Sequence, residues 1–395
     1  MPNGLIRFKV SCEPDAFLVI NARRGVGNVI RTQDYIPGTT LRGALAAING
    51  QMPNPMDWGV FQNRIRFPDL TPEGAVPIPL SAFTCKRAAG FSGAIAGHGA
   101  YDRLLFPRRL VRCRCKSDVK PMRGWMIGNQ SYSSPSIERL ATMHTAINPR
   151  TRTADPKHFY LEESVSCKQG FHGELIVSEE HAGHTLILLE QARLEGLRIG
   201  HGRSKGLGRT QLYFELSAED ESPLLPERLR SMQAKLRTLP GRGRDAAFTI
   251  TLRSRTILLD DYLRFRSRVR IEDLLEATQP NPDFEVLLRG FRLEASFTET
   301  EQVFGWNVAT GLPKSPDVAV AAGACFWLMR RGQLLTDSDV EILAAGLETL
   351  EKLGIGERRP EGFGRIAFCD PFHYGADSAV SKEGDDANRQ NYIFH

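Results

Sequence analysis

The stretch LRIGHGRSKGLGR (residues 197–209) decides the fold, because it recurs later in the chain as LGIGERRPEGFGR (residues 353–365). The two copies align without a gap and are identical at seven of thirteen positions, including three glycines and two arginines. Each copy follows a helical pattern and precedes an alternating, strand-like pattern. This repetition predicts two copies of one α+β module, each ending in helix, glycine loop and strand.

Two nucleotide-binding motifs are excluded for this loop. A dinucleotide fingerprint needs the order strand, glycine loop, helix, and here the order is reversed. A Walker A loop ends in Gly-Lys-Ser/Thr, whereas Gly206 is followed by Leu207. A tight turn accounts for the glycines, which adopt positive φ freely, but leaves the basic residues unexplained.

We therefore favour a loop that binds a phosphodiester backbone through exposed N–H groups and arginines, and keep the purely structural turn as the alternative. The first copy carries Ser204 and Lys205 where the second has Pro360 and Glu361. An acid in place of a lysine makes the second loop the poorer phosphate ligand. We expect the first loop to bind RNA and the second to serve subunit contact or packing. The predicted RNA-binding residues of the two loops are Gly200, Gly202, Arg203, Lys205, Gly206, Gly208, Arg209, Arg359 and Arg365.

The chain of 395 residues is long enough for two or three domains. The pattern predicts a first module over residues 1–216, with an insertion at about 85–135 where basic residues replace apolar periodicity. Residues 217–245, rich in Pro, Ser, Arg and Gly and with a short helical piece in the middle, are predicted to link it to a second module over 246–374. The polar end, 375–395, is predicted to be disordered. Thr336–Asp339 and Ser338–Glu341 both fit a capping box that starts a helix.

The net charge of +5 permits a polyanionic partner without requiring one. The start of the chain shows no basic region followed by a long apolar run, and no apolar run is long enough to cross a membrane. We expect a cytoplasmic protein that has no membrane partner.

A metal site is predicted inside the insertion. Cys85, His98, Cys113 and Cys115 have the spacing C-x12-H-x14-C-x-C, and this segment has little core of its own. Four such ligands point to structural zinc, which can supply local folding energy. The last pair has one intervening residue where two are usual, so free thiols stay open as the alternative.

The motifs IPGTTLRG (36–43), HTAINPRTRTA (144–154) and EGFGRIAFCDPFH (361–373) lie in this order with the two glycine loops. In this arrangement the chain resembles the RAMP superfamily of CRISPR proteins, in particular the RAMP subunit of type III-D effector complexes. The resemblance spans roughly residues 5–373.

The resemblance implies two ferredoxin-like (RRM-like) modules that bind the repeat-derived part of a guide RNA near its 5′ handle. It implies assembly with a large signalling subunit and backbone RAMP subunits, and indirect contact with target RNA. It adds to the RNA-binding residues the loop before IPG, the IPG motif itself and the 144–154 motif. These additions are Arg23, Arg24, Arg42, Arg150 and Arg152. The function implied is a non-catalytic, guide-RNA-binding subunit of an antiviral effector.

Two other functions stay open. Some backbone RAMP subunits cleave target RNA with an aspartate before IPG and a divalent metal, so Asp34 with Mg²⁺ is the candidate site of an endoribonuclease; the pair Asp260–Asp261 is a weaker one. His144 could act as a general base, although a local hydrogen bond is the simpler role. The third function is a protein-only scaffold whose glycine loops are turns.

Overall fold

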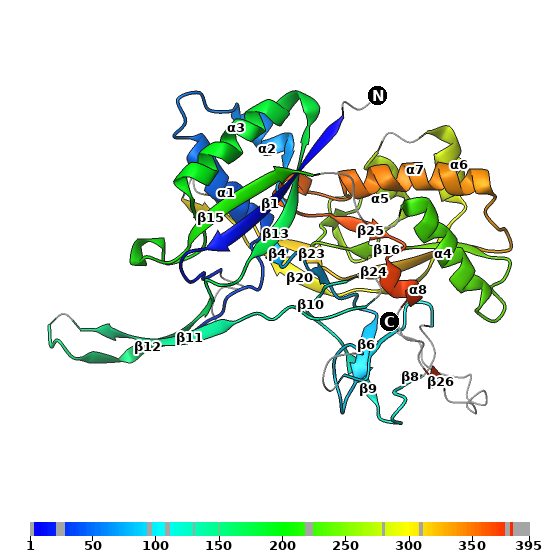
Figure 1. The fold of residues 1–395 in the computed structure, drawn as a ribbon, viewed down its shortest axis with the longest axis horizontal. Coiled ribbons are helices and arrows are strands. Elements are labelled where there is room, and N and C mark those ends of the chain that lie inside the picture. Colours follow the sequence, from blue (N-terminus) through cyan, green and yellow to red (C-terminus); the bar gives the residue numbers. More distant parts are fainter. Residues whose placement is uncertain are drawn as a thin grey trace.

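The computed structural model describes residues 4–20, 28–92, 97–106, 111–128, 131–148, 150–217, 224–278, 281–307, 311–375 and 380–381. Two modules lie side by side, and a long hairpin and a small lobe project from them (Figure 1). Within the described part of the chain, no helix is both long and apolar enough to cross a membrane.

The first module is an antiparallel sheet covered by two helices. Its strands run in the order β14-β15-β1-β13-β3, and β4 also pairs with β13. Along the chain the elements are β1 (Leu5–Pro14), α1 (Gly38–Asn49), β3 (Ile65–Arg66), β4 (Thr71–Pro72), β13 (Phe171–Ser178), α3 (Glu179–Glu195), β14 (Leu197–Arg198) and β15 (Arg209–Leu216). A short helix, α2 (Trp58–Asn63), precedes β3. Apolar residues of the alternating β1 pattern, such as Phe8 and Val10, are buried in this module's core.

The second module repeats this plan. Its sheet has the order β19-β24-β16-β25, and all pairs are antiparallel. The elements are β16 (Ala246–Leu252), α5 (Ile271–Glu276), α6 (Pro282–Arg289), β19 (Arg292–Phe297), β24 (Cys325–Arg330), α7 (Asp337–Leu353) and β25 (Ile366–Phe368). Both modules therefore follow β-α-β-β-α-β with the last strand beside the first, which is the ferredoxin-like topology. The predicted α+β class is confirmed, and α7 begins at the capping box of Thr336 and Asp339.

Residues 217–245, expected to be a linker, contain a helix of the second module. Helix α4 (Leu225–Arg237) buries Leu225, Leu229, Met232 and Leu236 in the same core as the sheet of that module. These side chains recur at helical spacing within a segment whose overall composition is that of a loop. The short helical piece predicted within the linker is therefore an amphipathic helix that belongs to the second module's core.

The insertion forms a small lobe that packs on the second module. Its strands are β5 (Val76–Pro77), β6 (Ala82–Cys85), β7 (Ala100–Asp102), β8 (Val111–Arg112), β9 (Val119–Pro121) and β10 (Trp125–Met126). Leu104 and Leu105 enter the second module's core. On α8 (Pro371–Gly375), His373 lies with its Nδ1 2.8 Å from the Asp102 carboxylate and its Nε2 2.8 Å from the Thr251 hydroxyl. A two-residue strand of the chain's end, β26 (Val380–Ser381), pairs with β8; residues 376–379 and 382–395 lie outside the described part.

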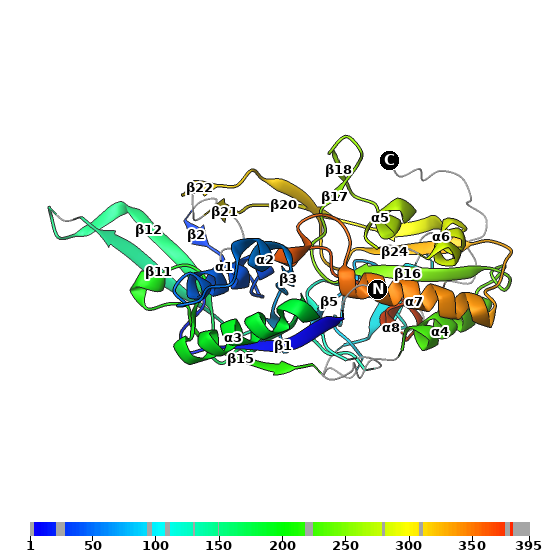
Figure 2. The same ribbon diagram turned by 90° about the horizontal axis from the view of Figure 1, so that it is seen from above.

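The projecting hairpin consists of β11 (Arg139–Ile147) and β12 (Ala154–Val165), and β2 (Val29–Ile30) pairs parallel with β12. It extends away from both modules in two perpendicular views (Figures 1 and 2). The remaining short strands of the second module are β17 (Leu258–Leu259), β18 (Phe265–Arg266), β20 (Thr300–Val303), β21 (Trp306–Asn307), β22 (Leu312–Pro313) and β23 (Asp317–Val320).

The second glycine loop lies at the boundary between the modules. The N–H of Phe67 donates to the carbonyl of Pro360 at 3.1 Å. A Cβ at Gly38, in the IPG motif, would stand 2.8 Å from the carbonyl oxygen of Glu361, so only glycine fits this approach. The packing role expected for this loop is therefore a contact with the chain's own first module.

Glu361 makes the electrostatic part of this contact. Its carboxylate lies 3.1 Å from Arg42 of the first module, 2.5 Å from Arg358 and 3.4 Å from Lys314. Burial acts to raise the pKa of Glu361, but the three cations outweigh burial and lower it. A carboxyl whose pKa is depressed on folding stabilises the fold above its ordinary pKa, and this stability is lost as the pH falls through the lower, folded value.

We predict that Glu361→Lys, which restores the residue of the first loop, destabilises the chain. It replaces the carboxylate that Arg42, Lys314 and Arg358 share by a fourth cation, leaving Arg358 its ion pair with Asp317, and we expect the free energy of unfolding to fall by about 3 kcal/mol. The reciprocal Lys205→Glu changes an exposed residue and serves as the control, with an unfolding midpoint in urea close to that of the wild type. Equal midpoints for both variants would contradict this account of the boundary.

Candidate RNA-binding surface and metal centre

The two glycine loops have the same backbone. Ile199 donates to Gly208 at 2.8 Å and Ile355 donates to Gly364 at 2.9 Å, and each loop contains one turn of 3₁₀ helix at matching positions. A Cβ at Gly208 would lie 2.0 Å from the carbonyl oxygen of Ile199. The shared glycines are thus required by the turn itself, as the structural interpretation proposed, and the side chains decide what else each loop does.

In the first loop the basic side chains face solvent. Arg209 has a side chain 79% exposed and lies 3.6 Å from Asp15. Arg203 is exposed, and within the described residues it has no ion-pair partner. Lys205 Nζ lies 3.4 Å from the Tyr160 hydroxyl of β12. Among the described residues, the backbone N–H groups of residues 202–204 have no backbone acceptor. These N–H donors therefore lie in the same loop as the cationic side chains of Arg203 and Lys205.

In the second loop the corresponding arginines contact the chain itself. Arg359 donates to the carbonyl of Gly354 at 3.4 Å, and Arg365 lies 3.6 Å from Glu174 of the first module. Together with Arg42 on Glu361, these arginines lie at the module boundary. The structure therefore separates the sequence-predicted cations into a boundary group and a solvent-facing group.

The hairpin adds cations to the solvent-facing group. Arg150 and Arg152 are exposed in the turn between β11 and β12, where the Asn148 side chain accepts from the N–H of Arg150 at 2.9 Å. Arg152 has a φ of 56°, in the left-handed region. Arg23 and Arg24 lie outside the described residues.

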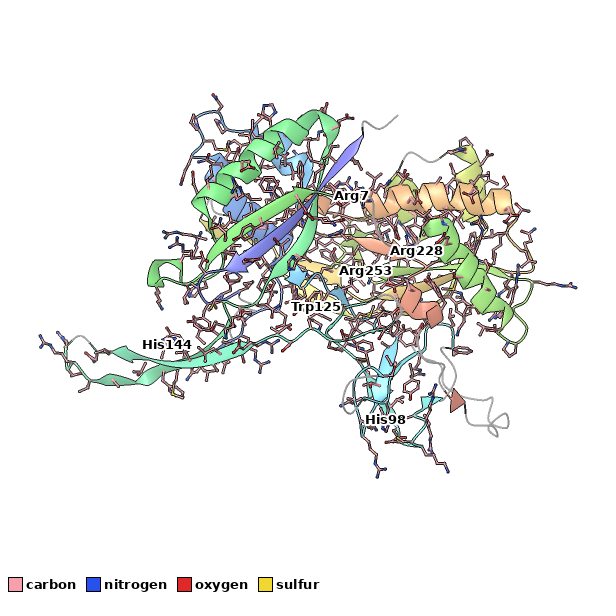
Figure 3. All side chains as sticks on the ribbon, viewed as in Figure 1. Arg7, His98, Trp125, His144, Arg228 and Arg253 are labelled. Carbon is pink, nitrogen blue, oxygen red and sulfur yellow. The ribbon has the colours of Figure 1, made fainter. Side chains whose placement is uncertain are left out.

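Partway along the hairpin, His144 of β11 and Tyr160 of β12 stack (Figure 3). Their ring centroids are 5.1 Å apart and the ring planes differ by 20°. The Nε2 of His144 lies 3.6 Å from the buried carboxylate of Glu162. Through the contact between Tyr160 and Lys205, this stack adjoins the first glycine loop.

Asp34 is engaged in an ion pair. Its carboxylate contacts the guanidinium of Arg139 at the start of β11, and its side chain is 29% exposed. Among the described residues, the grouping of three or more His, Cys, Asp or Glu that could hold a metal is the Cys/His cluster of the lobe, and Asp34 is not part of it. Among the described residues, Asp34 is therefore a carboxylate paired with a cation and outside any group of three possible metal ligands.

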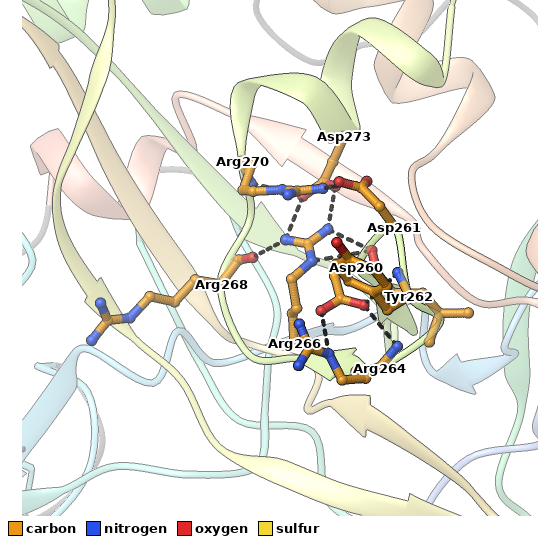
Figure 4. Close-up of polar contacts among 9 residues, drawn as sticks. Asp260, Asp261, Tyr262, Arg264, Arg266, Arg268, Arg270 and Asp273 are labelled. Atoms are coloured by element: carbon orange, nitrogen blue, oxygen red, sulfur yellow. Dashed lines mark hydrogen bonds and ion pairs between the residues drawn. The ribbon is translucent and has the colours of Figure 1, made fainter.

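The acidic pair on the second module shapes a turn. Asp260 accepts from the N–H groups of Tyr262 and Arg264, both at 2.9 Å, and these bonds help to lower its pKa (Figure 4). Arg266 contacts Asp273, which also accepts from the N–H of Arg270 at 2.7 Å. These interactions fix the backbone of the turn between β17 and β18, which gives the Asp260 carboxylate a structural role.

A cleft of about 770 Å³ lies between the two modules. Arg7, Arg228 and Arg253 lie around it (Figure 3), and it is also lined by Lys9 and Tyr213. Arg228 pairs with Glu351 at 2.8 Å, and Arg253 pairs with Asp370 at 2.5 Å. The sequence gives no signal for these cleft arginines. Arg7 lies in β1, Arg228 lies in α4 and Arg253 follows β16, and no motif links them.

The Cys/His cluster is assembled as the spacing predicted. The ligand atoms of Cys85, His98, Cys113 and Cys115 all lie within 4.8 Å of one another. The sulfurs of Cys85 and Cys115 are 3.6 Å apart, and Cys113 Sγ is 3.5 Å from His98 Nδ1. These separations suit one tetrahedral ion with metal–sulfur bonds of about 2.3 Å.

Hydrogen bonds favour a thiolate in this cluster. Burial acts to raise the pKa of Cys113, but the hydroxyl of Tyr101, 3.2 Å away, and neighbouring donors lower it to about 6. The neighbouring sulfurs in turn raise the pKa of His98. The donor set can hold a metal ion, and zinc is the ion that this combination of ligands favours.

Comparison with known proteins gives structural likeness only. No family model matches the chain, and no curated protein matches it. Similar solved structures include a type III-B Cmr-beta complex bound to target RNA and AMPPnP (11% identity, TM-score 0.37, covering 86% of this chain and 93% of that one). Another is a Cas6 product complex (12% identity, TM-score 0.35, covering 94% of this chain and 100% of that one). A third is Cas6 of Thermus thermophilus (10% identity, TM-score 0.37, covering 93% of this chain and 99% of that one). Likeness at this level does not by itself indicate a shared function.

Proposed function

We propose that this chain is a RAMP-type, CRISPR-associated protein that binds guide RNA as a non-catalytic subunit of a type III-D effector complex. In this role it caps the assembly near the 5′ repeat-derived handle and contacts the large signalling subunit and the backbone subunits. The ordered motifs from 36 to 373 and the two β-α-β-β-α-β modules support this proposal.

The observation that carries it is the difference between the two glycine loops. Their backbones match, yet the second is buried against its own chain while the first presents Arg203, Lys205 and Arg209 to solvent. N–H groups on a tight loop, flanked by guanidinium groups, form a concave site for phosphate oxygens. The hairpin cations Arg150 and Arg152 provide further contacts for the same strand of RNA.

The non-catalytic role is supported by the state of Asp34. Its pairing with Arg139 would have to break before the carboxylate could bind a divalent ion. Metal-assisted cleavage also needs further ligands to fix the ion, and among the described residues Asp34 belongs to no group of three such side chains.

We also propose that Cys85, His98, Cys113 and Cys115 hold a structural Zn²⁺ ion. Bound there, the ion would close a lobe that has only a small core of its own, and Tyr101 would hold the Cys113 thiolate in place. Such a site stabilises folding directly and takes no part in chemistry on RNA.

Replacing Arg203, Lys205 and Arg209 together by Ala should weaken binding of the guide RNA to the purified chain. If each contacts one phosphate of a single strand, the slope of log affinity against log salt should fall by about 2, since each contact contributes about 0.7. Filter binding over a series of salt concentrations measures this slope. The matched control is Arg230→Ala with Arg331→Ala, exposed cations on the second module. Unchanged affinity and slope in the loop variant would refute the proposed RNA site.

The chain purified without chelator should contain about one Zn²⁺, as a closed four-ligand site requires. Cys113→Ser should lose the ion and melt at a lower temperature, because the site no longer links the lobe together. Cys167→Ser is the control, since that thiol is exposed and outside the cluster. Elemental analysis by mass spectrometry gives the stoichiometry, and a metal-free wild type of undiminished stability would leave free thiols as the correct interpretation.

A further inference from the structure

The hairpin carries, partway along its length, an aromatic surface that the proposed phosphate contacts leave unused. His144 and Tyr160 are directly paired residues of β11 and β12, so their side chains lie on the same face of the ribbon. The neighbouring pair, Met143 and Leu161, lies on the opposite face. The stacked rings thus mark one side of the hairpin, which is the side that reaches Lys205 of the first glycine loop.

The stack is held in a fixed orientation yet stays accessible. Glu162 is buried, and its carboxylate lies 3.6 Å from Nε2 of His144, which restrains the imidazole edge. The His144 side chain is nevertheless 37% exposed. A ring whose position is already fixed loses little conformational freedom when a ligand stacks on it.

We propose that His144 and Tyr160 form a subsite for one unpaired RNA base, and that the phosphate beside this base is bound by Lys205 and the first glycine loop. This inference rests on the proposed RNA-binding role and specifies the form of RNA that is recognised. A base within a duplex is stacked between its neighbours and cannot place its face on these rings, so the site selects single-stranded RNA.

Charge decides which part of the nucleotide lies at which end of the subsite. The Glu162 carboxylate beside His144 repels a phosphate, whereas a base face is uncharged and tolerates it. Lys205 lies at the other end of the stack, next to the unpaired N–H groups and the exposed Arg203. The aromatic end therefore suits the base and the loop suits the phosphate.

The test uses the full-length chain and short oligouridylates that carry a single 2-aminopurine at successive positions. The wild-type protein should strongly quench the fluorescence of 2-aminopurine at one position, because stacking on an aromatic ring quenches the fluorescence of this base. His144→Ala should abolish that quenching and weaken binding by about 5- to 100-fold, as expected for the loss of one stacked base. His144→Phe should retain both, since it keeps a ring and removes the ring nitrogens.

The matched control is Met143→Ala, on the opposite face of the same strand and 71% exposed, which should bind and quench like wild type. Four outcomes would each overturn the subsite: quenching that does not depend on the position of 2-aminopurine, wild-type affinity in His144→Ala, equal competition by duplex RNA, and loss of quenching in His144→Phe. If the wild type binds none of the oligonucleotides, the RNA-binding role itself fails. Binding without position-specific quenching overturns only the subsite.

Discussion

The carboxylate of Glu361 is shared by cations from both modules, Arg42 from the first and Arg358 and Lys314 from the second. A carboxylate and several guanidinium or ammonium groups at a partly buried boundary are costly unless each has an opposite charge nearby. The close approach of the backbones, for which Gly38 must lack a Cβ, brings these groups within reach of one another. This contact holds the two sheets in the relative position that creates the cleft between them and leaves the first loop uncovered.

Because the loops share three glycines, the 3₁₀ turn and the bond that closes each loop, their backbone does not explain why they differ in role. The change from Lys205 to Glu361 inverts the charge at one matching position. In the second module that acid contacts Lys314, Arg42 of the IPG motif, and Arg358, which also pairs with Asp317. In the first module no acid replaces Lys205, and the side chains of Arg203, Lys205 and Arg209 are exposed. One duplicated backbone thus provides an internal contact in one copy and a solvent-facing basic loop in the other.

The sequence predicted those features that depend on local chemistry. Positive-φ glycines recur at three matching positions of the two loops, whereas Arg358 takes the positive φ of Gly202, so the repeat was visible and two α+β modules were inferred from it. The Cys/His spacing likewise predicted a cluster that the structure assembles. A short helical piece was predicted within 217–245, but its packing in the second module's core was not, because its buried side chains are scattered among charged residues in a segment with the composition of a loop. The cleft arginines come from strands and a helix far apart in the chain, and the stack of His144 on Tyr160 depends on the register of one hairpin; a single sequence contains no signal for either.

The lobe shows how a segment with little core can still be fixed in place. Successive residues of a strand point to opposite faces, and β7 uses both. Tyr101 faces the Cys/His cluster and donates to Cys113, whereas Asp102 faces the second module and contacts His373. The same carboxylate accepts from the hydroxyl of Ser81 and the N–H of Leu104, so all its contacts are satisfied within the lobe and the helix beneath it. The polar contact on one face of β7 adds to the packing of Leu104 and Leu105 in the second module's core, while the Cys/His cluster lies on the other face.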